Sequence, residues 1–219
     1  MSIKNQLQQL RKTIPPHVTL VAVSKTKPVT DLLEAHEAGQ RVFGENKIQE
    51  MTQKWGEMPN DVDWHMIGHV QRNKVKYMAQ YVSLIHGVDS LKLLIEINKQ
   101  AQKHNRIINC LLQIHIATEE TKFGLNETEA AELLQSPIFK ELTNVRVLGF
   151  MGMATFTDNK QQIRKEFRYL KSIFDNFAED HPQLTILSMG MSGDYQIAIE
   201  EGSTMVRIGS SIFGARNYH

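Results

Sequence analysis

The chain has 219 residues, of which 41% are hydrophobic and 22% are charged, and its formal net charge at pH 7 is +1. This length allows one large domain or two small ones, and the composition is typical of a soluble globular protein rather than a disordered chain. The balanced charge argues against a general nucleic-acid-binding protein, which usually carries a clear basic excess. No apolar run approaches the roughly 20 residues that a membrane-spanning helix needs.

A single cysteine, Cys110, lies within the apolar run 107–112. One cysteine cannot form an intrachain disulfide framework or a cysteine-rich zinc site, so we interpret it as a small buried hydrophobic residue. Residues 1–7 lack the uninterrupted apolar segment of a secretory signal. We therefore expect a cytoplasmic protein in a reducing compartment.

Eight short segments rich in apolar and β-branched residues recur along the chain. Most are near-continuous apolar runs that do not alternate with polar residues, which is typical of parallel strands covered on both faces. The expected strands are 18–23, 41–44, 62–67, 82–88, 107–116, 145–151, 185–189 and 204–208.

Between the expected strands lie segments with the apolar spacing of helices. In 160–178, four side chains are spaced for one buried face: Phe167, Leu170, Phe174 and Phe177. Ser90 is placed to accept a hydrogen bond as an N-cap. The expected helices are 2–12, ahead of the first strand, and then 30–38, 46–55, 90–103, 127–134 and 160–178.

This alternation predicts a single (β/α)8 TIM-type barrel domain over residues 1–219, with an extra N-terminal helix and no second β-domain. The alternative is an open doubly wound sheet, and the count of eight strands favours the barrel. Functional side chains of such barrels lie where the strands run into the following loops. The residues at the strand ends are therefore the candidates for function.

Lys25 follows the first expected strand, in the segment Ser24-Lys25-Thr26-Lys27. Burial at a barrel mouth would disfavour its ammonium form, lower its pKa and give an amine able to form a Schiff base. A solvated lysine at the start of a loop is the alternative, and spacing alone does not exclude it.

The second and third strands are followed by less decisive residues. Asn46 can cap the next helix or belong to a site, and the sequence leaves both open. His65 and His69 invite a metal interpretation, but an i, i+4 pair shares a face only in a helix, and this stretch is expected to be strand and turn. No acidic residue accompanies them at the usual zinc-protease spacing, so we expect no metal site.

Two Gly/Ser-rich turns, 190–194 and 207–214, follow the last two strands. Their backbone N–H groups and hydroxyls can form a phosphate cradle. Such residues also make plain short turns. However, the loops after strands seven and eight are where these barrels often bind phosphate, and this location favours a phosphate site.

Taken together, these segments resemble the pyridoxal phosphate homeostasis protein family, also known as the alanine-racemase-like N-terminal-domain family. The matches occur in order from the first strand to the last and cover nearly the whole chain. They are AVSKTKP at 22–28, FGEN at 43–46, WH at 64–65 with IG at 67–68, LSMGMS at 187–192, GSTMVRIG at 202–209 and IFGAR at 212–216. The chain departs from the family pattern at His69-Val70 and at 121–124, which would lie at the rim of the pocket.

The resemblance implies a fold-type III barrel with pyridoxal 5′-phosphate (PLP) at its mouth. Lys25 would hold PLP as a Schiff base, with Lys27 as the nearest alternative. Arg207 would face the pyridine nitrogen, and Asn46 would lie close to the ring. The phosphate would be held by Ser192, Gly209 and Ser210.

The resemblance further implies a role in PLP and vitamin B6 homeostasis rather than catalysis. Arginine only donates hydrogen bonds, so Arg207 would leave the ring nitrogen unprotonated and the cofactor a weaker electron sink. The resembled racemases take a second base, a tyrosine, from an added β-domain and a dimer partner, whereas here the last strand ends about ten residues before His219. We interpret Tyr195 and Tyr218, the tyrosines near the mouth, as structural or solvent-facing.

The expected partners are PLP and PLP-dependent apoenzymes, with no nucleic acid and no membrane, and the expected state is a monomer. Two alternatives stay open. One is a weak PLP-dependent amino-acid racemase, and the other is a barrel that binds a different phosphate.

Overall fold

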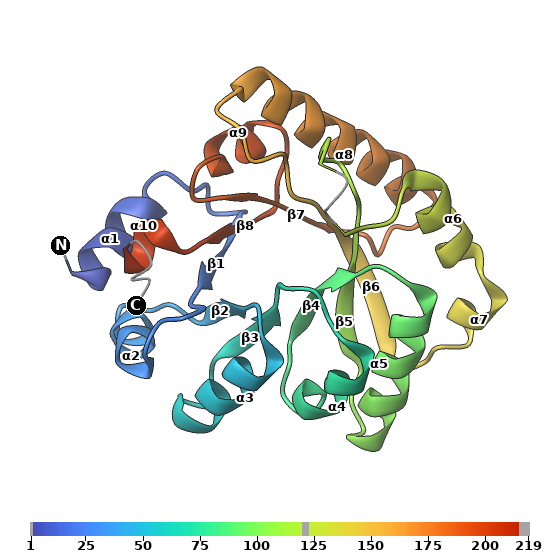
Figure 1. Ribbon diagram of the computed structural model, residues 1–219, viewed down its shortest axis with the longest axis horizontal. Helices are drawn as coiled ribbons and strands as arrows, with labels where there is room; N and C mark the ends of the chain where they lie inside the picture. The colour runs from blue at the N-terminus through green and yellow to red at the C-terminus, as the bar shows by residue number, and fades with distance from the viewer. Residues whose placement is uncertain (1, 120–122, 215–219) are drawn as a thin grey trace.

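Eight parallel strands close into a barrel in which each strand pairs with the next and β8 pairs with β1 (Figure 1). The computed structural model describes residues 2–119 and 123–214. The strands are β1 Thr19–Val23, β2 Val42–Glu45, β3 Asp63–Met66, β4 Leu84–Val88, β5 Ile108–Gln113, β6 Val145–Met151, β7 Ile186–Met191 and β8 Met205–Ile208. The predicted barrel is confirmed, and the open sheet is wrong because Thr19 to Ala22 pair in register with Met205 to Ile208.

The helices follow the strands around the barrel and cover its outer face (Figure 1). They are α1 Ile3–Arg11, α2 Val29–Glu37, α3 Ile48–Glu57, α4 Val75–Met78, α5 Leu91–Lys103, α6 Glu127–Gln135, α7 Pro137–Lys140, α8 Lys160–Asp180, α9 Tyr195–Glu200 and α10 Ser210–Phe213, with a 3-10 turn at Arg72–Lys74. The expected helices are all present. The expected helices do not include α4, α7, α9 and α10, because helices of four to six residues are too short to show a helical period.

One apolar cluster fills the inside of the barrel. Val21, Leu84, Leu111, Met151 and Met205 pack together, although they come from β1, β4, β5, β6 and β8. Side chains of strands on opposite sides of a barrel meet only through its interior, where branched and long residues fill successive layers. The barrel is therefore a packed core below its mouth.

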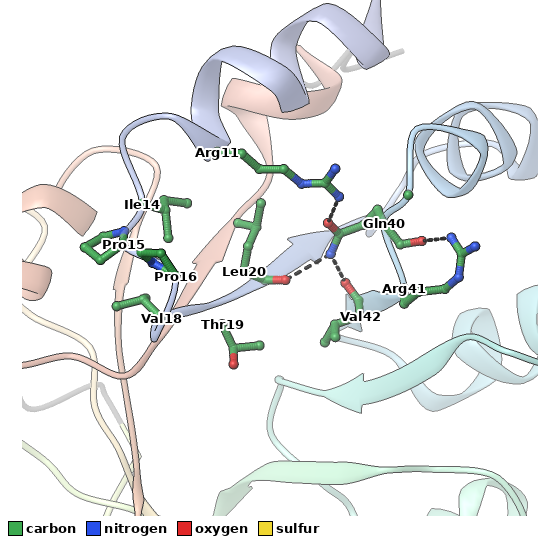
Figure 2. Close-up of a pocket in the computed structure, with 11 residues that line it drawn as sticks. Arg11, Ile14, Pro15, Pro16, Val18, Thr19, Leu20, Gln40, Arg41 and Val42 are labelled. Carbon is green, nitrogen blue, oxygen red and sulfur yellow. Dashed lines mark hydrogen bonds between the residues drawn. The ribbon is translucent and has the colours of Figure 1, made fainter.

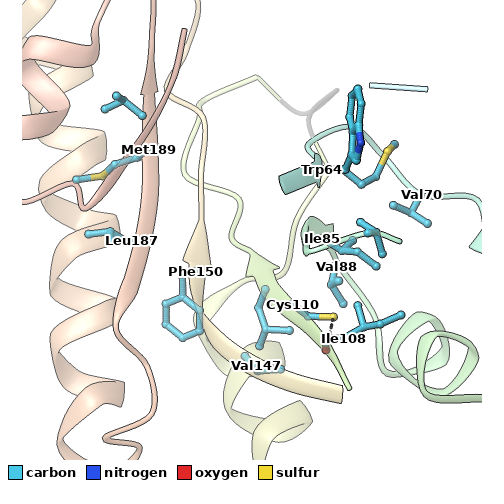
Figure 3. Close-up of a cluster of buried hydrophobic side chains, with 14 of the residues drawn as sticks. Trp64, Val70, Ile85, Val88, Ile108, Cys110, Val147, Phe150, Leu187 and Met189 are labelled. Carbon is cyan, nitrogen blue, oxygen red and sulfur yellow. Dashed lines mark hydrogen bonds between the residues drawn. The ribbon is translucent and has the colours of Figure 1, made fainter. Parts of the chain in front are cut away.

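A second apolar layer lies between the barrel and its helices, and Figure 3 shows part of it. Phe150 of β6 meets Phe174 and Phe177 of α8 edge-on, with ring centroids 6.2 and 5.4 Å apart. This confirms the buried face predicted for the helix. Cys110 is fully buried in the same layer, as its apolar surroundings in the sequence predicted.

A cavity of about 430 Å³ lies at the amino-terminal end of the strands (Figure 2). Its polar groups bond to one another: Arg11 donates to Gln40 at 3.1 Å, and Gln40 donates to the carbonyls of Leu20 and Val42 at 2.9 and 2.7 Å. These bonds brace the start of β1 and β2. This end of a barrel serves stability and not chemistry.

In the part of the chain that the structure describes, no helix is both long enough and apolar enough to cross a membrane.

Among the described glycines, Gly149 has the least room for a side chain. A Cβ at this position would lie 1.7 Å from the carbonyl oxygen of Ile186, and φ is +157°. Gly149→Ala is therefore expected to lower the free energy of unfolding by about 3 kcal/mol or more, because backbone must move. Gly56→Ala is the control, since nothing lies within 4 Å of its Cβ position on α3, and it should be neutral or stabilising by up to about 1 kcal/mol. Urea denaturation measures both, and equal effects would contradict this account.

Candidate cofactor site

A cavity of about 660 Å³ opens at the carboxyl ends of the strands. This volume lies within the range of sites for small molecules and cofactors, roughly 300–1,000 Å³. The residues predicted to bind the cofactor all line it, although they are spread from the first strand to the last: Lys25, Asn46, Ser192, Arg207, Gly209 and Ser210. The fold therefore brings the predicted site together, and the individual roles stay predictions.

The two candidate lysines differ in their surroundings. Lys25 and Lys27 are both half-buried and both line the cavity. The ammonium of Lys27 donates to the carbonyl oxygen of Phe213 at 2.8 Å, at the end of α10. Lys25 lies two residues beyond the end of β1, in the turn that leads to α2. Because both amines belong to residues that line the cavity, the choice of Lys25 over Lys27 stays a prediction.

Asn46 does not cap the helix that follows it. The N-cap of α3 is Lys47, and its side chain makes no capping hydrogen bond. Asn46 instead lies at the cavity, with its backbone pressed against Gly68, where a Cβ would come within 2.5 Å of the Asn46 carbonyl oxygen. The capping interpretation is wrong, because the backbone turns into the helix one residue later than the sequence suggested.

The turns after β7 and β8 are joined side by side. Ser192 Oγ accepts a hydrogen bond from the backbone N–H of Gly209 at 3.2 Å, and Asp194 Oδ1 accepts one from Met191 N at 2.5 Å. A Cβ at Gly209 would lie 2.9 Å from the carbonyl oxygen of Val23, so β1 and the β8 turn touch here. Only glycine fits this approach, which leaves backbone and hydroxyl groups lining one side of the cavity.

Arg207 is held rigidly below this turn. Its guanidinium donates to the Ser188 carbonyl at 2.9 Å, to Ser188 Oγ at 2.6 Å and to the Gly152 carbonyl at 3.1 Å. Burial lowers the pKa of Arg207 to about 10, against the opposing effect of Asp194. The side chain therefore stays charged near neutral pH and presents only donors to the cavity.

Two buried histidines extend the contacts of Arg207 across the barrel. His86 Nδ1 lies 3.0 Å from Ser188 Oγ, and His86 Nε2 lies 3.0 Å from His65 Nδ1. Burial lowers the pKa of His65 to about 3 and that of His86 well below its ordinary value. Both rings are therefore neutral near pH 7, and each has one donor and one acceptor nitrogen.

Arg207 can only donate to Ser188 Oγ. The Ser188 hydroxyl can donate to His86 Nδ1 or accept from it, and the tautomer of His86 that results decides which histidine donates in the contact between His86 Nε2 and His65 Nδ1. The sequence analysis missed His86 and Ser188 and left His65 without a role. Histidine inside an apolar strand was the available signal, because a buried polar side chain needs a partner.

The rim of the cavity is aromatic. His69 stacks on Phe123 with ring centroids 4.2 Å apart, and its Nδ1 lies 3.5 Å from Asp89 Oδ2. Phe156, also at the cavity, is 94% exposed. His69 thus points to the rim while His65 points to His86. Within residues 2–119 and 123–214, no group of three or more His, Cys, Asp or Glu side chains is arranged to hold a metal ion.

Of the two tyrosines expected near the mouth, Tyr195 lies among the described residues and Tyr218 does not. Tyr195 turns away from the cavity, and its hydroxyl lies 3.0 Å from Thr13 Oγ1, beyond α1. This contact supports the structural interpretation of Tyr195. Tyr218, and the departure from the family pattern at 121–122, lie outside the described residues.

The fold and the cavity define a (β/α)8 barrel with a small-molecule site at the carboxyl ends of its strands. A family model described as "Alanine racemase, N-terminal domain" matches residues 1–217. The chain is 40% identical to the pyridoxal phosphate homeostasis protein of Aquifex aeolicus, over 91% of this chain and 87% of that protein. It is 37% identical to the protein of the same name from Escherichia coli K12, over 93% and 88% of the two chains. The chain therefore belongs to the alanine racemase N-terminal-domain family and, within it, to the pyridoxal phosphate homeostasis proteins.

Solved structures agree with this assignment. PipY of Synechococcus elongatus PCC7942 is 34% identical to this chain, over 97% of this chain and 100% of that one. Its structures without PLP and with PLP bound match with TM-scores of 0.91 and 0.88. Alanine racemase of Bartonella henselae matches with a TM-score of 0.73 at 18% identity, over 98% of this chain and 58% of that one, and shares the fold.

The buried histidines predict a loss of stability in acid. The pKa of His65 is about 3 in the folded chain, against 6.5 for an ordinary histidine, so the unfolded state binds more protons and stability falls as pH drops below about 6.5. His65→Gln should flatten this decline by about 1.4 kcal/mol per pH unit.

The measurement is the free energy of unfolding in urea between pH 6 and pH 4.5, within the window that these pKa values define. His104→Gln, at an exposed position, is the control and should keep the wild-type slope. An unchanged slope in His65→Gln would show that His65 is protonated in the folded chain.

Proposed function

We propose that this chain binds PLP covalently through Lys25 and takes part in PLP and vitamin B6 homeostasis. The observation that carries this proposal is that one cavity gathers Lys25, Arg207 and the turns after β7 and β8. The relatives carry the name of pyridoxal phosphate homeostasis proteins, and PipY has been solved with PLP bound.

The residues present fit this cofactor. A phosphate needs donors, which the backbone and hydroxyls at Ser192, Gly209 and Ser210 supply without a Cβ in the way at position 209. A pyridine nitrogen without a proton needs a donor, and the buried guanidinium of Arg207 is one. An aldehyde needs an amine, and Lys25 lies at the same cavity.

When bound, PLP supplies an aldehyde that reacts with amines and a ring that withdraws electrons. The amine of Lys25 would hold the aldehyde as a Schiff base, with one water molecule released. Arg207 would donate to the ring nitrogen without giving it a proton, which would weaken electron withdrawal. These residues therefore hold the cofactor and do not activate it, which supports a binding protein over an enzyme.

The attachment residue can be found directly. Wild-type protein loaded with equimolar PLP should show an absorbance band at about 420 nm, and borohydride reduction followed by peptide mass mapping should find the modification on Lys25. Lys27, whose ammonium is bonded to the Phe213 carbonyl, should remain unmodified. A modification on Lys27, or no band at all, would contradict this part of the proposal.

The turns after β7 and β8, proposed to bind the phosphate, predict that a substitution there lowers affinity for PLP but not for pyridoxal. Ser192→Ala should weaken PLP binding by about tenfold, because a hydrogen bond to a charged group is worth about 1.5 kcal/mol. Binding of pyridoxal, which has no phosphate, should not change. Ser211→Ala is the control, since Ser211 neighbours Ser210 on α10 but does not line the cavity. Equal losses for both ligands would place the phosphate elsewhere.

Turnover decides between this function and a racemase. The proposed protein, loaded with PLP and mixed with each common L-amino acid, should release D-isomer more slowly than about 1 per second, an ordinary enzymatic rate. Faster release would overturn the binding-protein proposal.

The partners, assembly and location belong to the same proposal. We propose that loaded protein passes PLP to PLP-dependent apoenzymes, that it acts as a monomer and that it works in the cytoplasm. Free Cys110 suits a reducing compartment. Apart from Phe123 and Phe156, which both line the cavity, the large exposed apolar side chains sit on separate helices and loops, which suits a monomer. Light scattering and reactivation of an apoenzyme by loaded protein test these points.

A further inference from the structure

Three charged side chains next to Lys25 form a buried network, which we call the clamp: Glu45 at the end of β2, and Glu50 and Lys54 on α3. We propose that the clamp positions Lys25 for attachment to the cofactor. This inference rests on the proposed function, because it concerns how the same lysine is held.

Lys54 is the centre of the clamp. Its Nζ donates to Glu45 Oε1 at 2.8 Å, to Glu50 Oε1 at 2.7 Å and to the carbonyl oxygen of Ser24 at 2.8 Å. An ammonium has three donors, so these bonds use all of them. Lys54 is 5% exposed and Glu45 is fully buried. Breaking a buried ion pair leaves an uncompensated charge, which makes the arrangement rigid.

The clamp holds the residue before Lys25 and the residue after it. Ser24 is bound twice, since its hydroxyl donates to Glu45 Oε1 at 2.6 Å and its carbonyl accepts from Lys54. On the other side, the backbone N–H of Thr26 donates to Glu50 Oε1 at 2.6 Å. With both neighbours fixed, the Cα–Cβ direction of Lys25 is fixed as well.

The bond to Thr26 holds an unfavourable conformation. Thr26 has φ of +64°, in the left-handed region that β-branched residues rarely adopt. Such strain persists only where the surroundings enforce it, and it gathers at functional sites. The Glu50 contact supplies this enforcement. Without the clamp, Thr26 would relax toward an ordinary φ, and the backbone would turn Lys25 away from its place.

A purely stabilising role does not account for the clamp. In the described part of the chain, Glu45 Oε2 is buried with no hydrogen-bond partner, and burial raises the pKa of this carboxyl. An apolar replacement of similar volume often stabilises a protein as well as a buried ion pair does. The charged groups add directional hydrogen bonds to Ser24 and Thr26. These bonds set the direction in which the side chain of Lys25 leaves the backbone.

The test separates covalent attachment from non-covalent binding. Lys54→Met keeps the unbranched stem of the side chain up to Cε and removes the ammonium. It should form the band of the lysine adduct about tenfold more slowly than wild type or worse, since misplacement of a reacting group by about 1 Å costs up to 100-fold. Its affinity for pyridoxamine 5′-phosphate, which cannot form this bond, should not change. Lys47→Met, exposed at the N-cap of the same helix, should behave like wild type.

A second substitution tests the mechanism itself. Glycine adopts positive φ readily, so Thr26→Gly added to Lys54→Met should restore part of the lost rate. Glycine at positive φ also removes strain from the folded chain, so the free energy of unfolding of both variants in urea is measured as well, and a rate that recovers only in proportion to stability would overturn the mechanism.

Each outcome decides the proposal. Attachment at the wild-type rate in Lys54→Met, or equal loss of pyridoxamine 5′-phosphate binding, overturns the clamp. If Lys54→Met does not fold, Glu50→Ala decides, because Glu50 is partly exposed and still holds Thr26. It should slow attachment, and a wild-type rate overturns the clamp. If wild-type protein forms no adduct, the proposed function fails, and the clamp fails with it.

Discussion

The pairing of β1 with β8 is the constraint on which the rest of the structure depends. It closes the barrel and brings Lys25, which follows the first strand, to the same cavity as Gly209, which follows the last. Gly209 has no room for a Cβ against the carbonyl oxygen of Val23, so the backbone after β8 lies directly against the end of β1. Without closure, the amine and the phosphate turns would lie at opposite edges of an open sheet and could not share one ligand.

Closure also creates a low-dielectric interior in which polar groups must be paired. The barrel meets this requirement with two networks. One runs from Arg207 through Ser188 and His86 to His65, and it holds a charged donor at the bottom of the cavity. The other runs from Glu45 through Lys54 to the loop that carries Lys25. Both fix the direction of a side chain at the mouth, where function requires accuracy.

Sequence reasoning succeeded where a feature is local. The eight strands, the amphipathic α8 and the turns near 190 and 209 each leave a short pattern, and the structure bears them out. It could not decide whether Asn46 caps α3 or lines the site, because a one-residue shift in a helix start leaves no pattern in composition. It also missed Lys54, because the sequence of α3 does not distinguish a buried lysine from an exposed one. Two of its partners, Ser24 and Glu45, lie outside this helix.

The sequence alone determined that this chain would form eight strands and carry a lysine and two Gly/Ser turns at strand ends, since hydrophobic period and turn chemistry are local properties. Tertiary structure alone decided that these residues share one cavity, that Lys27 is bonded to Phe213 while Lys25 lies between clamped neighbours, and that two histidines are neutral. Those outcomes depend on burial and on contacts between residues far apart in the chain, and no local pattern encodes them.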